Sequence, residues 1–337
     1  MRSDVSRECA LGDTRASERR KPPRAKITDF ALRRGAPHRA CCRLPPTRNV
    51  PPSMPPPEPT RPSRPAFLAR GRVQREARLR VLQRFHSRIF RNSRDVTVWT
   101  PPGYGDPRRR HPVIYFQDGQ NIFDPKTAFG GHAWNAGETT ADLIKRRTIT
   151  PPILVGIGNT GANRINEYTP TRADYEIDGG KARSAGDAKR YARFVVTELK
   201  PFIDARYLTL PGPRTTSLVG SSMGGLVSLY TALWHPRVFG SVAALSPSLW
   251  WDNRIALRDF GSLKRRLDVR LWIDMGTAEP GWEVAQLFRD TLVNAGWTLG
   301  ENLEYHEIPG AEHSEQAWAA RLGAVLNFLA GRSADAR

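Results

Sequence analysis

Residues 217–233 read SLVGSSMGGLVSLYTAL, and they decide the fold. An apolar run typical of a buried strand leads into the pattern G-x-S-x-G, centred on Ser222, and an apolar run typical of a helix follows. A sharp strand-to-helix turn of this kind lifts the central hydroxyl above the sheet. Larger side chains two residues either side of the serine would collide, so Gly220 and Gly224 are needed. The stretch predicts that Ser222 is a nucleophile; a plain glycine-rich turn before a crossover helix is the alternative.

Short apolar runs and helix-like patterns alternate on both sides of this stretch. We expect strands at residues 78–89, 95–100, 112–117, 152–157, 216–219, 241–245, 269–274 and 302–308, and helices at 136–147, 185–205, 226–235, 284–295 and 315–329. The first two strands alternate in polarity and are expected to pair as antiparallel strands at the N-terminal edge. The repeated alternation predicts an α/β fold with a mainly parallel central sheet and helices on both faces.

The chain has 337 residues and a formal net charge of +19, and its first 65 residues have a composition of their own. They hold 15 Lys or Arg against 6 Asp or Glu, 13 of the 28 prolines and all three cysteines, Cys9, Cys41 and Cys42. A proline-rich segment without helical or strand periodicity does not pack a core. We therefore predict a disordered basic tail over residues 1–65 and one catalytic domain over 66–337. A mis-assigned start codon, with translation from Met54, is the alternative for residues 1–53.

Composition also bounds the class of protein. No run approaches the roughly 18 apolar residues of a membrane span, and no segment has the form of a secretory signal, so we expect a cytoplasmic protein without a membrane partner. Residues 66–337 hold no cysteine, which excludes disulfides and cysteine-based metal sites there. The positive charge suggests polyanion partners, but an arginine-rich composition explains it equally well. We expect no nucleic acid partner for the folded domain and predict no oligomeric state.

A serine nucleophile needs a base, and His313 is the best placed of the seven histidines. It alone lies in a loop between the last expected strand and the last expected helix. That loop is at the carboxyl edge of the sheet, as is the turn at Ser222. His313 also follows Ser222 in the chain, which is the order found with nucleophiles of this kind. A helix-capping or surface histidine is the alternative interpretation.

The acid that orients His313 is expected between Ser222 and His313 in the chain. Glu279 lies in the loop after the strand at residues 269–274, at the carboxyl end, and is the preferred candidate. Asp274, at the end of that strand, is a rival. Glu312 is a second rival, although its side chain is expected to point away from the adjacent His313.

The negative oxygen of a tetrahedral intermediate needs two backbone N–H groups. One is expected from Met223, directly after the nucleophile. The other is expected from the loop Asp118-Gly119-Gln120-Asn121, after the strand at residues 112–117. Gly119 would let the backbone turn in closely, so that Gln120 offers its N–H; a plain turn is the alternative.

These residues carry a resemblance to a known family. The chain resembles the α/β-hydrolases of the branch that includes esterase D, enterochelin-type esterases, feruloyl esterases and mycolyltransferases. The similarity spans about residues 67–330, and the pieces that carry it are VTVWTPPGY (96–104), VIYFQDGQNIFD (113–124), NRINEYTP (163–170), LVGSSMGGLVSLYTALWHPRVFG (218–240), SPSLWWDN (246–253), IDMGTAEPG (273–281) and PGAEHS (309–314).

The resemblance implies an α/β-hydrolase fold and a serine esterase that hydrolyses a small carboxylic ester or thioester through an acyl-enzyme. It implies no metal and no cofactor. In that family the residue after Asp-Gly supplies the second oxyanion amide, which falls on Gln120. The family's acid and base fall on Glu279 and His313. An acyltransferase that uses the same acyl-enzyme is one alternative, and a non-catalytic, basic-tailed binding protein on a hydrolase scaffold is another.

Aromatic residues near the carboxyl edge are the only hint of the substrate. Trp134, Trp250, Trp251 and Trp282 are expected there and could stack on an aromatic or sugar-bearing ester, although tryptophans that simply fill the rim would give the same pattern. We expect Arg164 and Glu167, within NRINEYTP, to form a structural pair.

Overall fold

A computed structural model describes residues 73–177 and 180–332. The predictions for residues 1–65, including the basic tail, its three cysteines and the alternative start at Met54, lie outside the described residues. No helix in the described part of the chain is long and apolar enough to cross a membrane.

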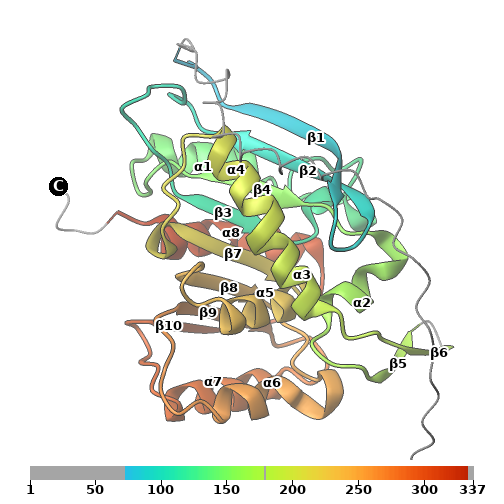
Figure 1. Cartoon of the computed structure of the whole chain (residues 1–337). Helices are drawn as coiled ribbons and strands as arrows, with labels where there is room; N and C mark the ends of the chain where they lie inside the picture. The colour runs from blue at the N-terminus through green and yellow to red at the C-terminus, as the bar shows by residue number, and fades with distance from the viewer. Residues whose placement is uncertain (1–72, 178–179, 333–337) are drawn as a thin grey trace, which may run out of the picture. The chain divides into compact units, whose positions relative to one another are not determined.

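One sheet runs through the domain (Figure 1). Its strand order is β1-β2-β4-β3-β7-β8-β9-β10. The bounds are β1 Arg78–Ser87, β2 Asn92–Thr100, β3 Val113–Phe116, β4 Ile153–Ile157, β7 Thr216–Ser221, β8 Ser241–Leu245, β9 Arg270–Gly276 and β10 Leu303–Ile308. The strands from β4 to β10 pair in parallel, whereas β1 and β2 pair antiparallel at the edge. The predicted mainly parallel sheet with an antiparallel N-terminal edge is confirmed.

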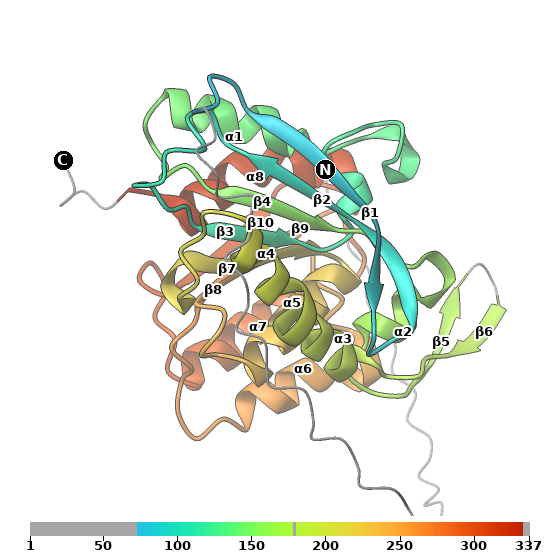
Figure 2. The ribbon, with the colours of Figure 1, turned by 45° about the horizontal axis from the view of Figure 1, so that its top comes forward.

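Each face of the sheet is covered by its own helices (Figure 2). Side chains of a strand alternate between the faces, so Val113 and Tyr115 pack in one apolar core while Ile114 and Phe116 pack in the other. The helices of the first core are α3 Ala188–Phe194, α5 Met223–Trp234, α6 Trp251–Gly261 and α7 Glu283–Asn294, and those of the second are α1 Ala136–Lys145 and α8 Glu315–Ala330. This arrangement is an α/β-hydrolase fold, with loops that follow β3, β7, β8, β9 and β10 at one edge.

The structure departs from the predicted elements where segments are short or irregular. The helix expected at residues 185–205 is three successive pieces, α3, a π-helical turn Val195–Leu199 and α4 Lys200–Arg206. The sequence analysis missed α2 Arg164–Tyr168, the hairpin of β5 Asp174–Ile177 with β6 Gly180–Arg183, and α6. Three residues near the start of α6 have positive φ. Short 3-10 turns lie at Gly119–Asn121, Phe129–Gly131, Gly161–Asn163 and Pro213–Thr215.

A buried ion pair attaches α2 to the sheet. Arg94 of β2 donates from Nη1 to Glu167 Oε2 at 2.8 Å and from Nη2 to Glu167 Oε1 at 3.1 Å. Both side chains are almost fully buried. The Arg94 guanidinium also lies 4.6 Å from the centre of the Phe194 ring of α3. Two planar hydrogen bonds of this kind fix orientation as well as distance, so α2 is held firmly beside the site described below.

We predict that Glu167→Gln destabilises the protein by about 3 to 5 kcal/mol, because it leaves the Arg94 charge buried without its counter-ion. The control is Asp106→Asn, which removes the partner of the solvent-exposed Arg108 and should cost far less, because water solvates the Arg108 charge. Urea denaturation measures both free energies of unfolding. Equal stability of the two variants would contradict the role given to the buried pair.

Candidate active site

The turn between β7 and α5 holds Ser222 in a strained conformation. Its backbone has φ 54° and ψ −124°, which an L-residue adopts only when its surroundings force it. A Cβ on Gly220 would lie 2.3 Å from the carbonyl oxygen of Gly224. A Cβ on Gly224 would lie 3.0 Å from Asp118 Oδ2 and Gln117 Cβ. The two glycines therefore allow the tight turn and also let the segment after β3 pack against the start of α5.

His313 and Glu279 form a hydrogen-bonded pair in the loops after β10 and β9. His313 Nδ1 lies 2.6 Å from Glu279 Oε2. Burial acts to raise the pKa of Glu279, but hydrogen bonds from His313, Ser246 and the Gly276 amide outweigh it and lower this pKa. The ionised carboxylate can only accept, so Nδ1 of His313 carries the proton. Nε2 of the half-exposed imidazole is then free to act as a base.

Asp274, the rival acid, has other partners. It is fully buried, accepts a hydrogen bond from Trp272 Nε1 at 2.8 Å and forms an ion pair with Arg321, whose Nη2 lies 3.2 Å from Asp274 Oδ1. Burial raises the pKa of Asp274 to about 6, although the Arg321 charge opposes this rise. The carboxylate of Glu312 is not hydrogen-bonded to His313 either, within the ranges that the structure describes. Of the three candidates, only Glu279 contacts the imidazole.

Ser246, which the sequence analysis missed, connects these groups. Its hydroxyl donates to Glu279 Oε1 at 2.5 Å and accepts from Trp318 Nε1 and Arg321 Nη2, each at 3.0 Å. A hydroxyl has one donor and two acceptor positions, and all are used. Ser246 therefore holds Glu279 in one orientation. Within residues 73–177 and 180–332, no group of three His, Cys, Asp or Glu side chains could hold a metal ion.

The hydroxyl of Ser222 is hydrogen-bonded to Ser248, a second serine of the loop after β8. Ser222 Oγ lies 3.3 Å from Ser248 Oγ, and the Ser248 amide donates to the Ser222 carbonyl at 3.1 Å. No hydrogen bond joins Ser222 to His313 in the described part of the chain. The loop after β8 thus contacts the serine through Ser248 and the His313–Glu279 pair through Ser246. The motif SPSLWW was the signal in the sequence that could have identified this loop.

Two backbone N–H groups near Ser222 have no acceptor. Among the described residues, no hydrogen bond uses the amide of Met223, at the first position of α5, or that of Gln120. Gln120 lies in the 3-10 turn that follows β3, and its neighbour Asp118 lies against Gly224 of the elbow. Unpaired backbone donors are rare in folded proteins unless water or a ligand reaches them. These two amides are therefore available to an acceptor from water or a ligand.

The segment of Gln120 is fixed by Asp118, which the sequence analysis had read only as part of a turn. Asp118 has φ 52°, and its carboxylate accepts two hydrogen bonds from Arg164 of α2, at 2.7 and 2.8 Å. Asn159 donates a third, at 2.7 Å. The expectation that Arg164 and Glu167 pair with each other is wrong. Although residues three apart lie on one face of a helix, Arg164 pairs with Asp118 and Glu167 pairs with Arg94.

A buried carboxylate joins the segment of Gln120 to the helix after His313. Glu315, the first residue of α8, accepts from Asn121 Nδ2 at 2.8 Å and from the indole N–H of Trp134. Burial raises the pKa of Glu315 from its ordinary value of 4.5 to about 7, with Asp118 adding to the rise and Arg164 opposing it. Glu315 thus carries an energetically costly charge two residues from the imidazole.

The four tryptophans expected at the rim have different environments. Trp134 is buried and packs on Phe116 and Trp318, and Trp251 is buried against Tyr175. Their expected role as rim residues is therefore corrected, because both rings are covered by the fold. Trp282 is half-buried and packs on the core. Only Trp250 is open to solvent, at 54% exposure.

The chain is similar to known esterases in sequence and fold. A family model described as "Putative esterase" matches residues 87–329, so the chain belongs to this esterase family of α/β-hydrolases. It is 29% identical over 168 residues to the ferri-bacillibactin esterase BesA of Bacillus subtilis, and 32% identical over 180 residues to a siderophore enterobactin esterase of Emericella nidulans. These matches cover 47% and 48% of the chain. The chain spans about half of each relative, 54% in both cases.

Solved structures share the fold. An enterobactin esterase from Shigella flexneri, in the presence of enterobactin, superimposes with a TM-score of 0.58 at 20% identity, over 80% of this chain and 62% of that one. A ferulic acid esterase superimposes with a TM-score of 0.59 at 17% identity, over 76% of this chain and 98% of that one. At such identities the likeness concerns the fold alone.

We predict that Asp118→Asn lowers kcat for ester hydrolysis by roughly 10- to 100-fold with little change in KM. The substitution weakens the contact with Arg164 that holds the segment of Gln120. Removing an oxyanion donor outright costs about 10²- to 10³-fold, so displacing the Gln120 amide from that proposed role should cost less. Steady-state kinetics on p-nitrophenyl acetate measures it. Asp106→Asn, which breaks an exposed Arg–Asp pair, is the matched control. An unchanged kcat in Asp118→Asn would show that Asp118 has no positioning role.

The Glu315 carboxylate makes stability depend on pH. Its pKa is raised on folding, so the folded state binds the proton more tightly and stability falls as pH rises from about 4.5 to about 7. The cost is on the order of 3 kcal/mol by pH 8. We predict that Glu315→Gln flattens this fall relative to wild type and to Glu301→Gln, an exposed control, in urea denaturation at pH 5 and pH 8. If the free energy of unfolding changed equally with pH in all three proteins, the buried Glu315 carboxylate would not be the cause of the fall.

Proposed function

We propose that this protein is a serine esterase in which Ser222 attacks the ester, His313 transfers the proton and Glu279 orients the imidazole. The observation that carries the proposal is the 2.6 Å contact between His313 Nδ1 and Glu279 Oε2, at the sheet edge where the elbow presents Ser222. The contact leaves Nε2 of His313 as the proton acceptor. It also places the Glu279 charge where it stabilises the protonated imidazole.

The reaction begins when the Ser222 hydroxyl leaves Ser248 and donates to His313 Nε2. Ser222 Oγ forms a bond with the carbonyl carbon of the ester, and its proton passes to Nε2. The tetrahedral intermediate then expels the alcohol, which takes that proton back, and an acyl group remains on Ser222. Water attacks the acyl group by the same route, with His313 again as the base, and releases the acid.

The amides of Met223 and Gln120 stabilise the negative oxygen in both steps. Each amide donor of this kind contributes about 3 kcal/mol to the transition state. The amides belong to two segments packed against each other at Gly224 and held by the Asp118–Arg164 ion pair. The chain therefore aligns these donors before the ester arrives.

We infer that the substrate carries an aromatic acyl group. Two exposed aromatic residues belong to segments connected to the site. Trp250, 54% exposed, is two residues from Ser248, and Phe129, 79% exposed, donates its amide to Asn121 next to Gln120. BesA and the ferulic acid esterase bear names that refer to a siderophore and to ferulic acid. A flat acyl group between two rings would gain stacking contacts that an acetyl group cannot make.

We predict that Ser222→Ala abolishes labelling by a fluorophosphonate probe and lowers kcat/KM for p-nitrophenyl acetate by roughly 10³-fold or more. Ser248→Ala is the control, because it removes the neighbouring hydroxyl and leaves the nucleophile. It should retain the label on the peptide that contains residue 222, as read by mass spectrometry. Full labelling of Ser222→Ala would exclude the proposed nucleophile.

An ester panel then defines the substrate and the fate of the acyl group. Wild type and Ser222→Ala are compared on feruloyl esters, a catecholate trilactone, acetylated sugars and S-formylglutathione. A higher kcat/KM for the feruloyl esters and the catecholate trilactone than for the other esters supports an aromatic substrate. An added sugar or alcohol distinguishes hydrolysis from acyl transfer, since a transferase forms the new ester in place of the free acid.

A further inference from the structure

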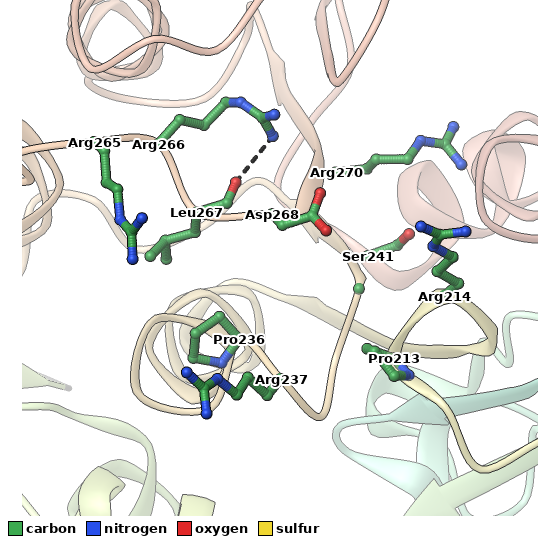
Figure 3. A pocket seen from close by; sticks show the side chains of 11 residues that line it. Pro213, Arg214, Pro236, Arg237, Ser241, Arg265, Arg266, Leu267, Asp268 and Arg270 are labelled. Carbon is green, nitrogen blue, oxygen red and sulfur yellow. Dashed lines mark hydrogen bonds between the residues drawn. The ribbon is translucent and has the colours of Figure 1, made fainter.

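A pocket of about 780 Å³ lies at the edge of the sheet where β7, β8 and β9 begin, opposite the loops that hold Ser222 and His313. Figure 3 shows the side chains that line it. Three segments that lead into neighbouring parallel strands line it. Pro213 and Arg214 precede β7, Pro236 and Arg237 precede β8, and residues 265–268 precede β9. The six residues of β7 separate this edge from Ser222 by about 20 Å, at about 3.3 Å per residue. The pocket is therefore separate from the catalytic machinery.

The lining is strongly basic. It contains five arginines and one acid, Asp268, and so has four positive charges in excess; the arginines are Arg214, Arg237, Arg265, Arg266 and Arg270. In Figure 3, Arg237 and Arg265 lie at one side of the pocket and Arg214 and Arg270 at the other. All five line one pocket. Salt at physiological ionic strength screens repulsion mainly between charges more than about 8 Å apart, so closer arginines repel one another.

The arginines have no counter-ions of their own. None of the five forms an ion pair, and neither does Asp268, within the part of the chain that the structure describes. Arg266 donates to the carbonyl of Leu267, and Arg270 lies over the Phe328 ring at 4.3 Å. Arg270 is exposed to solvent, as are Arg214, Arg237 and Arg265. A bound anion would remove the repulsion between these charges.

We propose that this pocket is a binding site for a short polyphosphate chain, either free or as part of a nucleotide. Guanidinium groups bind phosphate oxygens through two parallel hydrogen bonds, which makes arginine the preferred residue for such ligands. A triphosphate spans several phosphates and carries about four negative charges near neutral pH, which matches the excess of the lining. The Ser241 hydroxyl and the apolar walls from Pro213, Pro236 and Leu267 complete the pocket.

The proposal goes beyond ester hydrolysis and does not depend on it. The strands β7 and β8 start at this pocket and end at the catalytic loops that hold Ser222 and Ser246. A ligand that binds only the folded protein stabilises it in proportion to the logarithm of its concentration. Bound polyphosphate would therefore raise the melting temperature of the domain.

The test is isothermal titration calorimetry on the full chain in low salt, with sodium tripolyphosphate, ATP and adenosine as probes. The pocket variant is Arg237→Ala with Arg265→Ala. The control is Arg110→Ala with Arg193→Ala, which removes the same charge from exposed positions elsewhere. The basic segment 1–65 is present in every protein, so its own affinity for anions cancels in the comparison.

We expect tripolyphosphate to bind wild type and the control alike, and the pocket variant about tenfold or more weakly, the value of one charge-assisted hydrogen bond. Tighter binding of ATP than of tripolyphosphate identifies a nucleotide as the source, and equal binding identifies the phosphate chain alone. Equal affinity of the pocket variant and the control overturns the proposal, as does binding of adenosine comparable to that of ATP. The ester-hydrolysis rate of the pocket variant should equal that of wild type, which keeps this test separate from that of Ser222.

Discussion

The rest of the site depends on the absence of side chains at Gly220 and Gly224. A single methyl group on Gly220 would overlap the Gly224 carbonyl, so the turn that puts Ser222 at φ 54° forms only with glycine there. The same lack of a side chain at Gly224 lets Gln117 and Asp118 approach the start of α5. One steric constraint thus places the nucleophile and brings the two unpaired amides to neighbouring segments. Strain of this kind persists only where surrounding structure over-determines it, and the parallel strands on either side of β7 supply that structure.

Buried polar contacts carry this constraint outward to the other loops. The Ser246 hydroxyl is hydrogen-bonded to Glu279 and to Trp318 and Arg321 of α8. These bonds connect the loops after β8 and β9 to the C-terminal helix. Glu315 fastens the same helix to Asn121. Helix α8 is therefore connected through Ser246 to the acid of the proposed triad, and directly through Glu315 to the segment of the proposed oxyanion amides. Removal of one partner from such a network leaves a buried charge or hydroxyl without a bond, which costs more than the bond itself was worth.

Sequence patterns predicted the sheet, the elbow and the pairing of His313 with Glu279, because these features depend on local motifs and on chain order. Ion pairs over long sequence separations could not be predicted. Arg164 binds Asp118, 46 residues away, and no periodicity relates the two. The exposure of aromatic side chains could not be predicted either: Trp250 and Trp251 are adjacent, yet Trp250 is open to solvent and Trp251 is buried against Tyr175, which is distant in the chain. The disordered tail over residues 1–65 and the cytoplasmic location stay predictions from composition alone.

The measurement that tests the central claim most directly is a crystal structure of the protein after reaction with a phosphonate ester. The account predicts phosphorus bonded to Ser222 Oγ and one phosphonyl oxygen within about 2.7 to 3.1 Å of the amides of Met223 and Gln120. It also predicts that His313 Nε2 lies within hydrogen-bond reach of Ser222 Oγ while Nδ1 keeps its contact with Glu279. Phosphorus on another residue, or a phosphonyl oxygen that faces solvent with His313 out of reach, would contradict it.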